Sequence, residues 1–215
     1  SLLFELPQQD RNWKVKPAMY IGEMIGYEGQ GSLLQALKEK GWAESLSAGP
    51  ALSDRGATLF SIDIGLTPVG YQHHEQILVE LFAWLELIQQ EGIVSWRQTE
   101  LAVMSDMAFR YAEKISPADY VTKLASNMHK YSDNKLLRAP YQRGEFDKQL
   151  ISGLMDQLSI ENMLLMVIAP EVDTSELSVF YQTPFSVETM NKEVIEVLKA
   201  TDSDFNLSLV GKNPY

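Results

Sequence analysis

Residues 58–66 alternate strictly between two sets of side chains, and this pattern constrains the fold more than any other stretch of the chain. Thr58, Phe60, Ile62, Ile64 and Leu66 form one set, and Leu59, Ser61, Asp63 and Gly65 form the other. A period of two predicts a β-strand with one face toward a core. Residues 44–49 predict a weaker strand, which the turn-rich residues 50–56 join antiparallel to the first. The long apolar stripe over residues 68–92 predicts an amphipathic helix that covers the sheet.

Further helices and strands are expected on both sides of this hairpin. Residues 1–6 predict a strand that Pro7 ends, a helix begins at Ala18, and Ser32 caps a second helix that Gly41 closes. Later elements are expected as helices over 95–114, 117–131 and 147–158, a buried strand over 162–170, an edge strand over 177–182, and a polar loop after Pro184. Strands mixed with long helices, without regular βαβ alternation, predict an α+β fold. We expect a mainly antiparallel sheet with long helices packed on one face.

The stretch "YIGEMIGYEGQGSLLQALKEKGW", residues 20–42, places four glycines before a regular helix. Such a turn often binds phosphate through free backbone N–H groups, but this one lacks the lysine of a P-loop. A dinucleotide fingerprint requires a glycine where Leu34 stands, and Glu23 and Glu28 would repel a phosphate. Gly22 and Gly26 lie four residues apart on one helix face, and small residues at this spacing let another backbone come close.

The composition limits the partners and the chemistry of the chain. It carries 18 basic and 29 acidic residues, a net charge of −11, which argues against nucleic acid and against an anionic membrane surface. The absence of cysteine excludes thiol catalysis, cysteine zinc sites and disulfides. It is compatible with compartments on either side of a membrane, and we favour a periplasmic or secreted parent over a cytoplasmic one. Because the chain starts at Ser1 without an initiator methionine, we expect a piece of a longer protein.

The sequence contains no complete catalytic or metal-binding constellation. "HEQIL" at His74 begins like the HExxH zinc helix, but Leu78 stands where the second histidine is required. The inverted HxxEH arrangement and the Gly-x-Ser-x-Gly nucleophile elbow are both absent. We therefore expect no catalytic residue, no metal ligand and no cofactor within the chain itself. An independent enzyme that uses scattered carboxylates, such as Asp63, Glu75 and Asp106, is a weaker alternative.

Four segments carry a resemblance to a known family. They are "KPAMYIGEMIGYEGQGSLLQALKEKGW", "GLTPVGYQHHEQILVELFAWLELIQQEGI", "FRYAEKISPADYVTKLASNMHKYS" and the closing "NPY". In register over nearly the whole chain, they resemble the second domain of the insulinase/pitrilysin-type zinc metallopeptidases, the inverzincin family. The resemblance implies one α+β domain over residues 1–205 and an extended stub over 206–215 that leads to the second half of the parent.

The resemblance also implies a role. Full proteins of this family have four related α+β domains in two halves that close around a peptide, with zinc held in the first domain. This chain resembles the non-catalytic second domain, which lines the chamber and contacts the catalytic first domain and the C-terminal half of the same protein. Taken alone it is expected to be inactive. The alternative is a scaffold or assembly domain of a relative that has lost catalysis.

In relatives, this domain grips the N-terminal segment of a peptide by adding it as a strand to a sheet edge. The matching positions in this sequence are Met19, Glu23, Gly26, Leu46, Ser47 and Ala48. The sequence departs from the family pattern, with Met19, Glu23 and Tyr27 where histidines stand and Ala48 where a glycine stands. We hypothesise that Gly22 and Gly26 leave room for a substrate backbone between the helix and residues 44–49, and that Glu23 pairs with the peptide's α-amino group. The alternative is tight packing at small residues.

Overall fold

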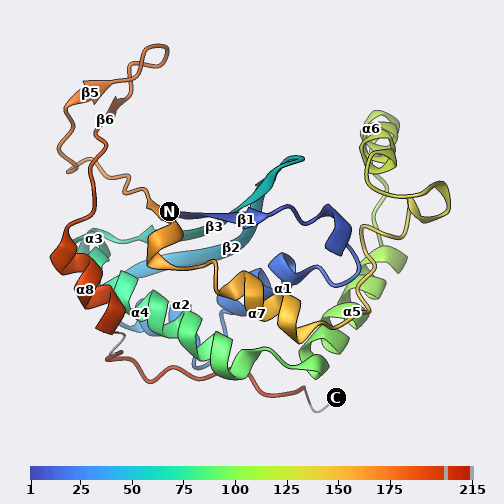
Figure 1. Ribbon diagram of the computed structural model, residues 1–215, viewed down its shortest axis with the longest axis horizontal. Coiled ribbons are helices and arrows are strands. Elements are labelled where there is room, and N and C mark those ends of the chain that lie inside the picture. The colour runs from blue at the N-terminus through green and yellow to red at the C-terminus, as the bar shows by residue number, and fades with distance from the viewer. Residues whose placement is uncertain (201–202, 214–215) are drawn as a thin grey trace.

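A four-stranded antiparallel sheet forms the centre of the computed structural model, which describes residues 1–200 and 203–213. The strand order is β2-β3-β1-β4 (Figure 1). The strands are β1 (Leu2–Pro7), β2 (Ala43–Ser53), β3 (Ala57–Leu66) and β4 (Met163–Leu165). β2 and β3 form the predicted antiparallel hairpin, with register shifts between Ala43 and Ser45 and between Pro50 and Leu52. The predicted α+β class and the mainly antiparallel sheet are confirmed.

Helices cover one face of this sheet. They are α1 (Pro17–Ile25), α2 (Leu33–Glu39), α3 (Pro68–Gln72), α4 (His74–Leu87), α5 (Ser95–Arg110), α7 (Lys148–Met155) and α8 (Lys192–Ala200), whereas α6 (Pro117–Met128) projects on the other side (Figure 1). Short helical turns add Asp10–Asn12, Ile88–Gly92, Asp133–Lys135 and Ile160–Asn162. α1, α2, α4 and α7 lie together beneath the sheet (Figure 1). No helix within residues 1–200 and 203–213 combines the length and the apolarity needed to cross a membrane.

The core fills the space between the sheet and these helices. Phe4 on β1 and Phe60 on β3 are register partners, and both are completely buried. Tyr20 on α1 and Trp84 on α4 meet them from the helix layer and are equally buried. Complete burial of a large apolar side chain stabilises a fold by about 1.5–3 kcal/mol. Alternate residues of β3 therefore secure the sheet to the helices, as their period of two predicts.

Local capping explains where several helices begin. The Ser32 hydroxyl accepts a hydrogen bond from Gln35 N at 3.1 Å, which confirms the predicted cap of α2. Gly41 takes a left-handed conformation, φ 69°, directly after that helix. The helix expected over 68–92 begins at Pro68 as predicted, but it breaks at His73 into α3 and α4 and ends in a π turn. The helices expected over 95–114 and 117–131 end earlier, at Arg110 and Met128.

Three predictions for the C-terminal third are wrong. Only Met163–Leu165 of the strand expected over 162–170 pairs with β1, and the Ile168 side chain is 81% exposed. The edge strand expected over 177–182 is instead a turn between β5 (Glu176–Leu177) and β6 (Pro184–Phe185), where Gln182 has φ 53°. The polar stretch after Pro184 contains α8, which packs on α4.

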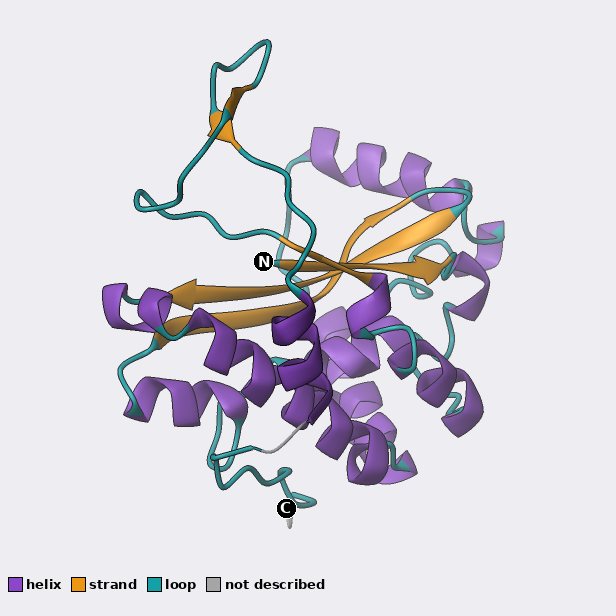
Figure 2. Ribbon diagram, turned by 60° about the vertical axis from the view of Figure 1, so that its left-hand side comes forward, coloured by secondary structure: helices purple, strands orange, loops and turns teal. Residues whose placement is uncertain are grey.

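Two projections rise on the sheet face opposite the core helices. One is the β5–β6 hairpin, and the other is the segment that carries α6 (Figure 1). Figure 2 shows both projections on the same side of the sheet, while the other helices lie on its far side. The face of the sheet between the two projections is therefore left without a helix layer.

Residues 203–213 follow α8 and run along the helix layer in an extended conformation. Glu80 on α4 is only 4% exposed and accepts hydrogen bonds from the Ser203 hydroxyl and, at 3.0 Å, from Asp204 N. Ser208 N donates to Gly31 O at 2.9 Å, and Arg97 on α5 donates to Val210 O at 2.7 Å. The last two residues of the predicted stub over 206–215, which complete the "NPY" match, lie outside the described residues.

Candidate functional site

β2 forms one edge of the sheet, because β3 is its only neighbouring strand among the residues that the structure describes. Within residues 1–200 and 203–213, no backbone hydrogen bond from outside this ladder reaches the main chain of 43–53. Leu46 is 4% exposed, so its side chain belongs to the core, while Ser45 and Ser47 on either side of it are exposed. An edge strand with unpaired N–H and C=O groups is the surface that an added peptide strand uses.

α1 packs directly on this strand through a glycine. A Cβ placed on Gly22 would lie 2.6 Å from Ala48 O and 3.1 Å from Gly49 Cα. No substrate backbone fits between helix and strand at this point, so the hypothesis of a gap at Gly22 is wrong and close packing explains this glycine. A Cβ on Gly26, one turn later, would lie 3.9 Å from Ala48 N, an ordinary contact distance, and 3.2 Å from Gly22 O, a tight one that requires a small shift. Gly26 therefore remains the residue beside the edge of β2 where a side chain would add bulk.

Gly22→Ala is expected to lower the free energy of unfolding by about 1–3 kcal/mol, although alanine favours a helix over glycine by about 0.5–1 kcal/mol. The overpacking term is the larger one because the new methyl group meets backbone atoms of β2, which cannot rotate away. Gly153→Ala in α7 is the matched control, since nothing lies within 4 Å of its Cβ position. Urea unfolding should show stabilisation of the control by about 0.5–1 kcal/mol. Stabilisation of both variants would contradict the contact between α1 and β2.

The structure brings the predicted substrate-contact residues together from two elements in contact. α1 and the residue that follows it supply Met19, Glu23 and Gly26, and β2 supplies Leu46, Ser47 and Ala48. The Met19 side chain is 40% exposed at the start of α1, whereas Leu46 offers only its main chain. Whether these residues contact a peptide stays a prediction.

Glu23 already has a partner that the sequence did not suggest. Its Oε1 lies 3.4 Å from Nη2 of Arg143, and the exposed fractions of the two side chains are 47% for Glu23 and 6% for Arg143. Burial lowers the pKa of Arg143, and the Glu23 carboxylate acts in the opposite direction. The two residues are 120 positions apart, and no local pattern in the sequence relates them.

Lys16 is a second, half-buried cation in this region. It precedes α1 in a left-handed conformation, φ 52°, and its ammonium group donates to Pro140 O. Burial, followed by the nearby Arg143 cation, lowers the pKa of Lys16 from 10.5 to about 8. Lys16 and Arg143 therefore share one partly dehydrated environment next to the start of α1.

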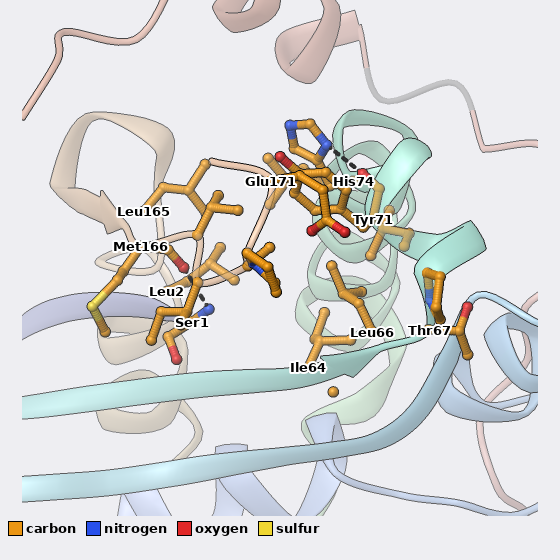
Figure 3. A pocket seen from close by; sticks show the side chains of 18 residues that line it. Ser1, Leu2, Ile64, Leu66, Thr67, Tyr71, His74, Leu165, Met166 and Glu171 are labelled. Carbon is orange, nitrogen blue, oxygen red and sulfur yellow. Dashed lines mark hydrogen bonds between the residues drawn. The ribbon is translucent and has the colours of Figure 1, made fainter. Parts of the chain in front are cut away.

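A pocket lies where β3 meets α3 and α4, at the end of the sheet far from the start of α1. Figure 3 shows Tyr71, His74 and Glu171 gathered on one side of it and Leu165 and Met166 on the other. His74 Nδ1 lies 2.8 Å from Tyr71 O, and its ring stacks on Tyr71 at 5.7 Å. These contacts give His74 a structural place at the break between α3 and α4.

Zinc does not fit the residues of this chain. His73 stacks on Trp42 with ring centroids 4.5 Å apart, and His73 Nδ1 lies 2.8 Å from Gln76 Oε1. Leu78 occupies the position of the missing second ligand and is buried in the core. In the described ranges 1–200 and 203–213, no three His, Cys, Asp or Glu side chains are grouped so as to hold a metal ion.

Comparison with known proteins places this geometry in a family. The model "Peptidase M16 inactive domain" matches residues 1–101, and "Middle or third domain of peptidase_M16" matches residues 109–215. The interval between the two matches falls within α5, so the expected single domain over residues 1–205 remains a prediction. A crystal structure of pitrilysin superposes on 100% of this chain with a TM-score of 0.93 and 24% identity, and the match covers 23% of that chain.

Curated relatives agree with these matches. Insulin-degrading enzyme of Mus musculus is 32% identical over 94% of this chain and 20% of its own length. The peroxisomal insulin-degrading enzyme-like 1 of Arabidopsis thaliana is 32% identical over 93% and 21%, and nardilysin of Rattus norvegicus is 29% identical over 100% and 19%. The chain thus spans about a fifth of the length of these relatives. With two domain models of one family matching nearly all of its residues, the chain belongs to the peptidase M16 family.

Proposed function

We propose that this chain is a non-catalytic domain that lines the substrate chamber of a peptide-degrading zinc metallopeptidase. We also propose that it binds an extended segment of the substrate along β2. The match to the inactive domain of the family and the names of the insulin-degrading relatives support the first part. The zinc and the catalytic residues then belong to another domain of the parent, since this chain's histidines do not fit a metal site. The available edge of β2 is the observation that carries the second part.

The grip relies on main chain rather than side chains. A peptide that pairs with residues 46–48 extends the sheet by one strand, and the hydrogen bonds are made by groups that every peptide possesses. The buried Leu46 side chain fixes the strand to the core, so the edge is held rigid before substrate arrives. Such a site suits an enzyme that accepts many sequences, because the edge selects for extended conformation.

The partners proposed for the chain are the catalytic first domain and the C-terminal half of the same protein. Exposed apolar side chains on α5 and on α6 support contact with further protein, because large apolar side chains gathered on an exposed helix often mark an interface. They include Val103, Met104 and Met107 on α5 and Val121 and Met128 on α6, each more than half exposed.

Gly26→Leu in the parent enzyme tests the grip. The new side chain would project beside Ala48 N and obstruct a strand added to β2. We expect KM to rise about tenfold, or 1.4 kcal/mol, for peptides long enough to reach β2, and to stay unchanged for short peptides that span only the scissile bond. Gly153→Leu on the exposed face of α7 is the matched control and should alter neither class. Equal kinetics of the Gly26 variant and the wild type on long peptides would count against the grip.

A further inference from the structure

A cavity of about 430 Å³ opens beside the start of α1, next to the far end of β2. Residues from six separate parts of the chain line it. They include Trp13, Lys16, Pro17 and Met19 near α1, Pro50 and Ser53 on β2, Lys130 and Tyr131 after α6, and Pro140, Tyr141 and Arg143 from the segment before α7. Thr58 on β3, Ser105 on α5 and the Asp10 carboxylate also line it, so the walls combine aromatic and apolar side chains with three cations and one carboxylate.

The cations of this cavity are incompletely neutralised. Lys130 is paired with Asp10 at 2.9 Å, and Glu23 is the partner of Arg143. The Glu23 side chain is nearly half exposed and lies at the long distance of 3.4 Å, while the Arg143 side chain is 6% exposed. Lys16 donates to a carbonyl, Pro140 O, and has no ion-pair partner within the described part of the chain.

Dehydrated cations without a full counter-charge favour an anion that enters from solvent. Moving a charge out of water is costly unless an opposite charge compensates it, and a low-dielectric wall strengthens the attraction. The lowered pKa of Lys16 has the same physical origin, namely burial next to a second cation. A guanidinium beside an ammonium can hold a carboxylate with charge-assisted hydrogen bonds, and the surrounding rings can cover the methylene groups that carry it.

The cavity lies in line with the proposed peptide path. Pro50, one of its lining residues, is two residues beyond Ala48 on β2, and Met19 lines it from the adjacent helix. Because a strand advances by about 3.3 Å per residue, a peptide paired with residues 46–48 would reach the cavity within two or three further residues. A side chain at that point of the peptide, or its C-terminus, would come within reach of Lys16 and Arg143.

We propose that this cavity, between Lys16 and Arg143, is a carboxylate subsite for the peptide that β2 binds. This inference rests on the proposed function and adds a preference to it: substrates with a carboxylate a fixed number of residues from the segment on β2 are bound more tightly. Glu23 then acts as an internal competitor, since it occupies Arg143 until the peptide carboxylate arrives.

The test is fluorescence anisotropy at pH 7 with labelled ten-residue peptides. Each has a free N-terminus, a C-terminal amide and a single Glu moved through positions 3–8, with a Gln twin for every peptide. We expect one position, or two alternate ones, to bind about tenfold tighter with Glu than with Gln, equivalent to 1.4 kcal/mol. A second arm replaces the amide with a free C-terminal carboxylate on Gln peptides of graded length, and so distinguishes a side-chain carboxylate from a terminal one.

Variants of the chain assign the effect to the cavity. Lys16→Met and Arg143→Met should bring the Glu/Gln ratio to about one, whereas Lys16→Arg should keep it because the positive charge remains. Lys14→Met is the matched control, since Lys14 is paired with Glu145 at 2.7 Å and does not line the cavity. Glu23→Gln should raise the ratio about threefold by freeing Arg143, a gain that a purely structural role of these residues would not produce.

The outcomes separate this inference from the proposed function. Absence of binding by every peptide, Gln twins included, would overturn the grip of β2 itself. Binding that is equal for Glu and Gln peptides at every position, and for free and amidated C-termini, would overturn the carboxylate subsite and leave the grip intact. If Arg143→Met unfolds the chain, the Gln peptides also lose affinity. In that case the Glu/Gln affinity ratios of Lys16→Met and Glu23→Gln test the carboxylate subsite.

Discussion

Trp84→Ala is expected to lower the free energy of unfolding by about 3–5 kcal/mol, the range for deleting a buried aromatic ring. The Trp84 side chain is completely buried at the centre of the helix layer, and its Nε1 donates to Ile25 O at 3.3 Å. The substitution therefore leaves a cavity and also an unpaired carbonyl at the end of α1. Urea unfolding with linear extrapolation measures the loss.

Trp84→Phe reduces the cavity contribution, because it keeps one aromatic ring in the core while it removes the N–H donor and the rest of the indole. We expect it to lose about 1–3 kcal/mol, clearly less than the alanine variant. Ile25 immediately precedes Gly26, so this hydrogen bond also holds the candidate peptide-binding residue in place. A loss below about 1 kcal/mol for Trp84→Ala would contradict the view that α4 anchors α1.

Gly70→Ala is expected to destabilise the chain by about 3 kcal/mol, at the upper end of overpacking effects. A Cβ at Gly70 would lie 1.7 Å from Trp42 O and 2.6 Å from Trp42 C, an overlap that no side-chain rotation relieves. The junction is also fixed by Thr67, whose hydroxyl accepts a hydrogen bond from Gly70 N at 3.0 Å and donates to Gly41 O at 2.6 Å. The start of β2 must therefore move away from α3.

Calorimetry gives the readout for this second variant. A loss of 3 kcal/mol corresponds to a fall in Tm of about 6–12 °C for a chain of this size. Val69→Ala is the matched control, since it lies in the same short helix with a side chain 51% exposed, and it should change Tm by less than about 2 °C. Similar melting of Gly70→Ala and the control would show that α3 does not sit tightly against Trp42.

The parts of the fold that sequence predicts well are those set by local chemistry. The alternation in β3 and the Ser32 cap each depend on residues within a few positions of one another, whereas the turn expected over 50–56 is shorter, because β2 continues to Ser53. The apolar run over 162–170 was misleading because a short continuous run has no period, and only tertiary pairing decides how much of it becomes strand. α8 was predictable, because Val194, Ile195, Val197 and Leu198 recur at helical spacing among charged residues, and the expectation of a polar loop overlooked this pattern.

The candidate site was predictable to a smaller degree for the same reason. The resemblance located the residues of α1 and β2, but the partner of each one is set by contacts across the chain. From the sequence, Gly22 could leave room either for a substrate backbone or for close packing within the chain. Its short distance to Ala48 O shows that close packing is correct. The pairing of Glu23 with Arg143 and the burial of Lys16 join segments more than 100 positions apart.

The two register shifts in β2 have a consequence for self-association. An unpaired edge invites other copies of a protein to stack against it, and the hazard grows with the length of uninterrupted edge. Here the pairing is irregular between Ala43 and Ser45 and again between Pro50 and Leu52, and Pro50 contributes no N–H. The regular edge between these shifts, residues 45–50, is short, so it offers too little to a second sheet and discourages fibril growth while it leaves the proposed peptide contact available.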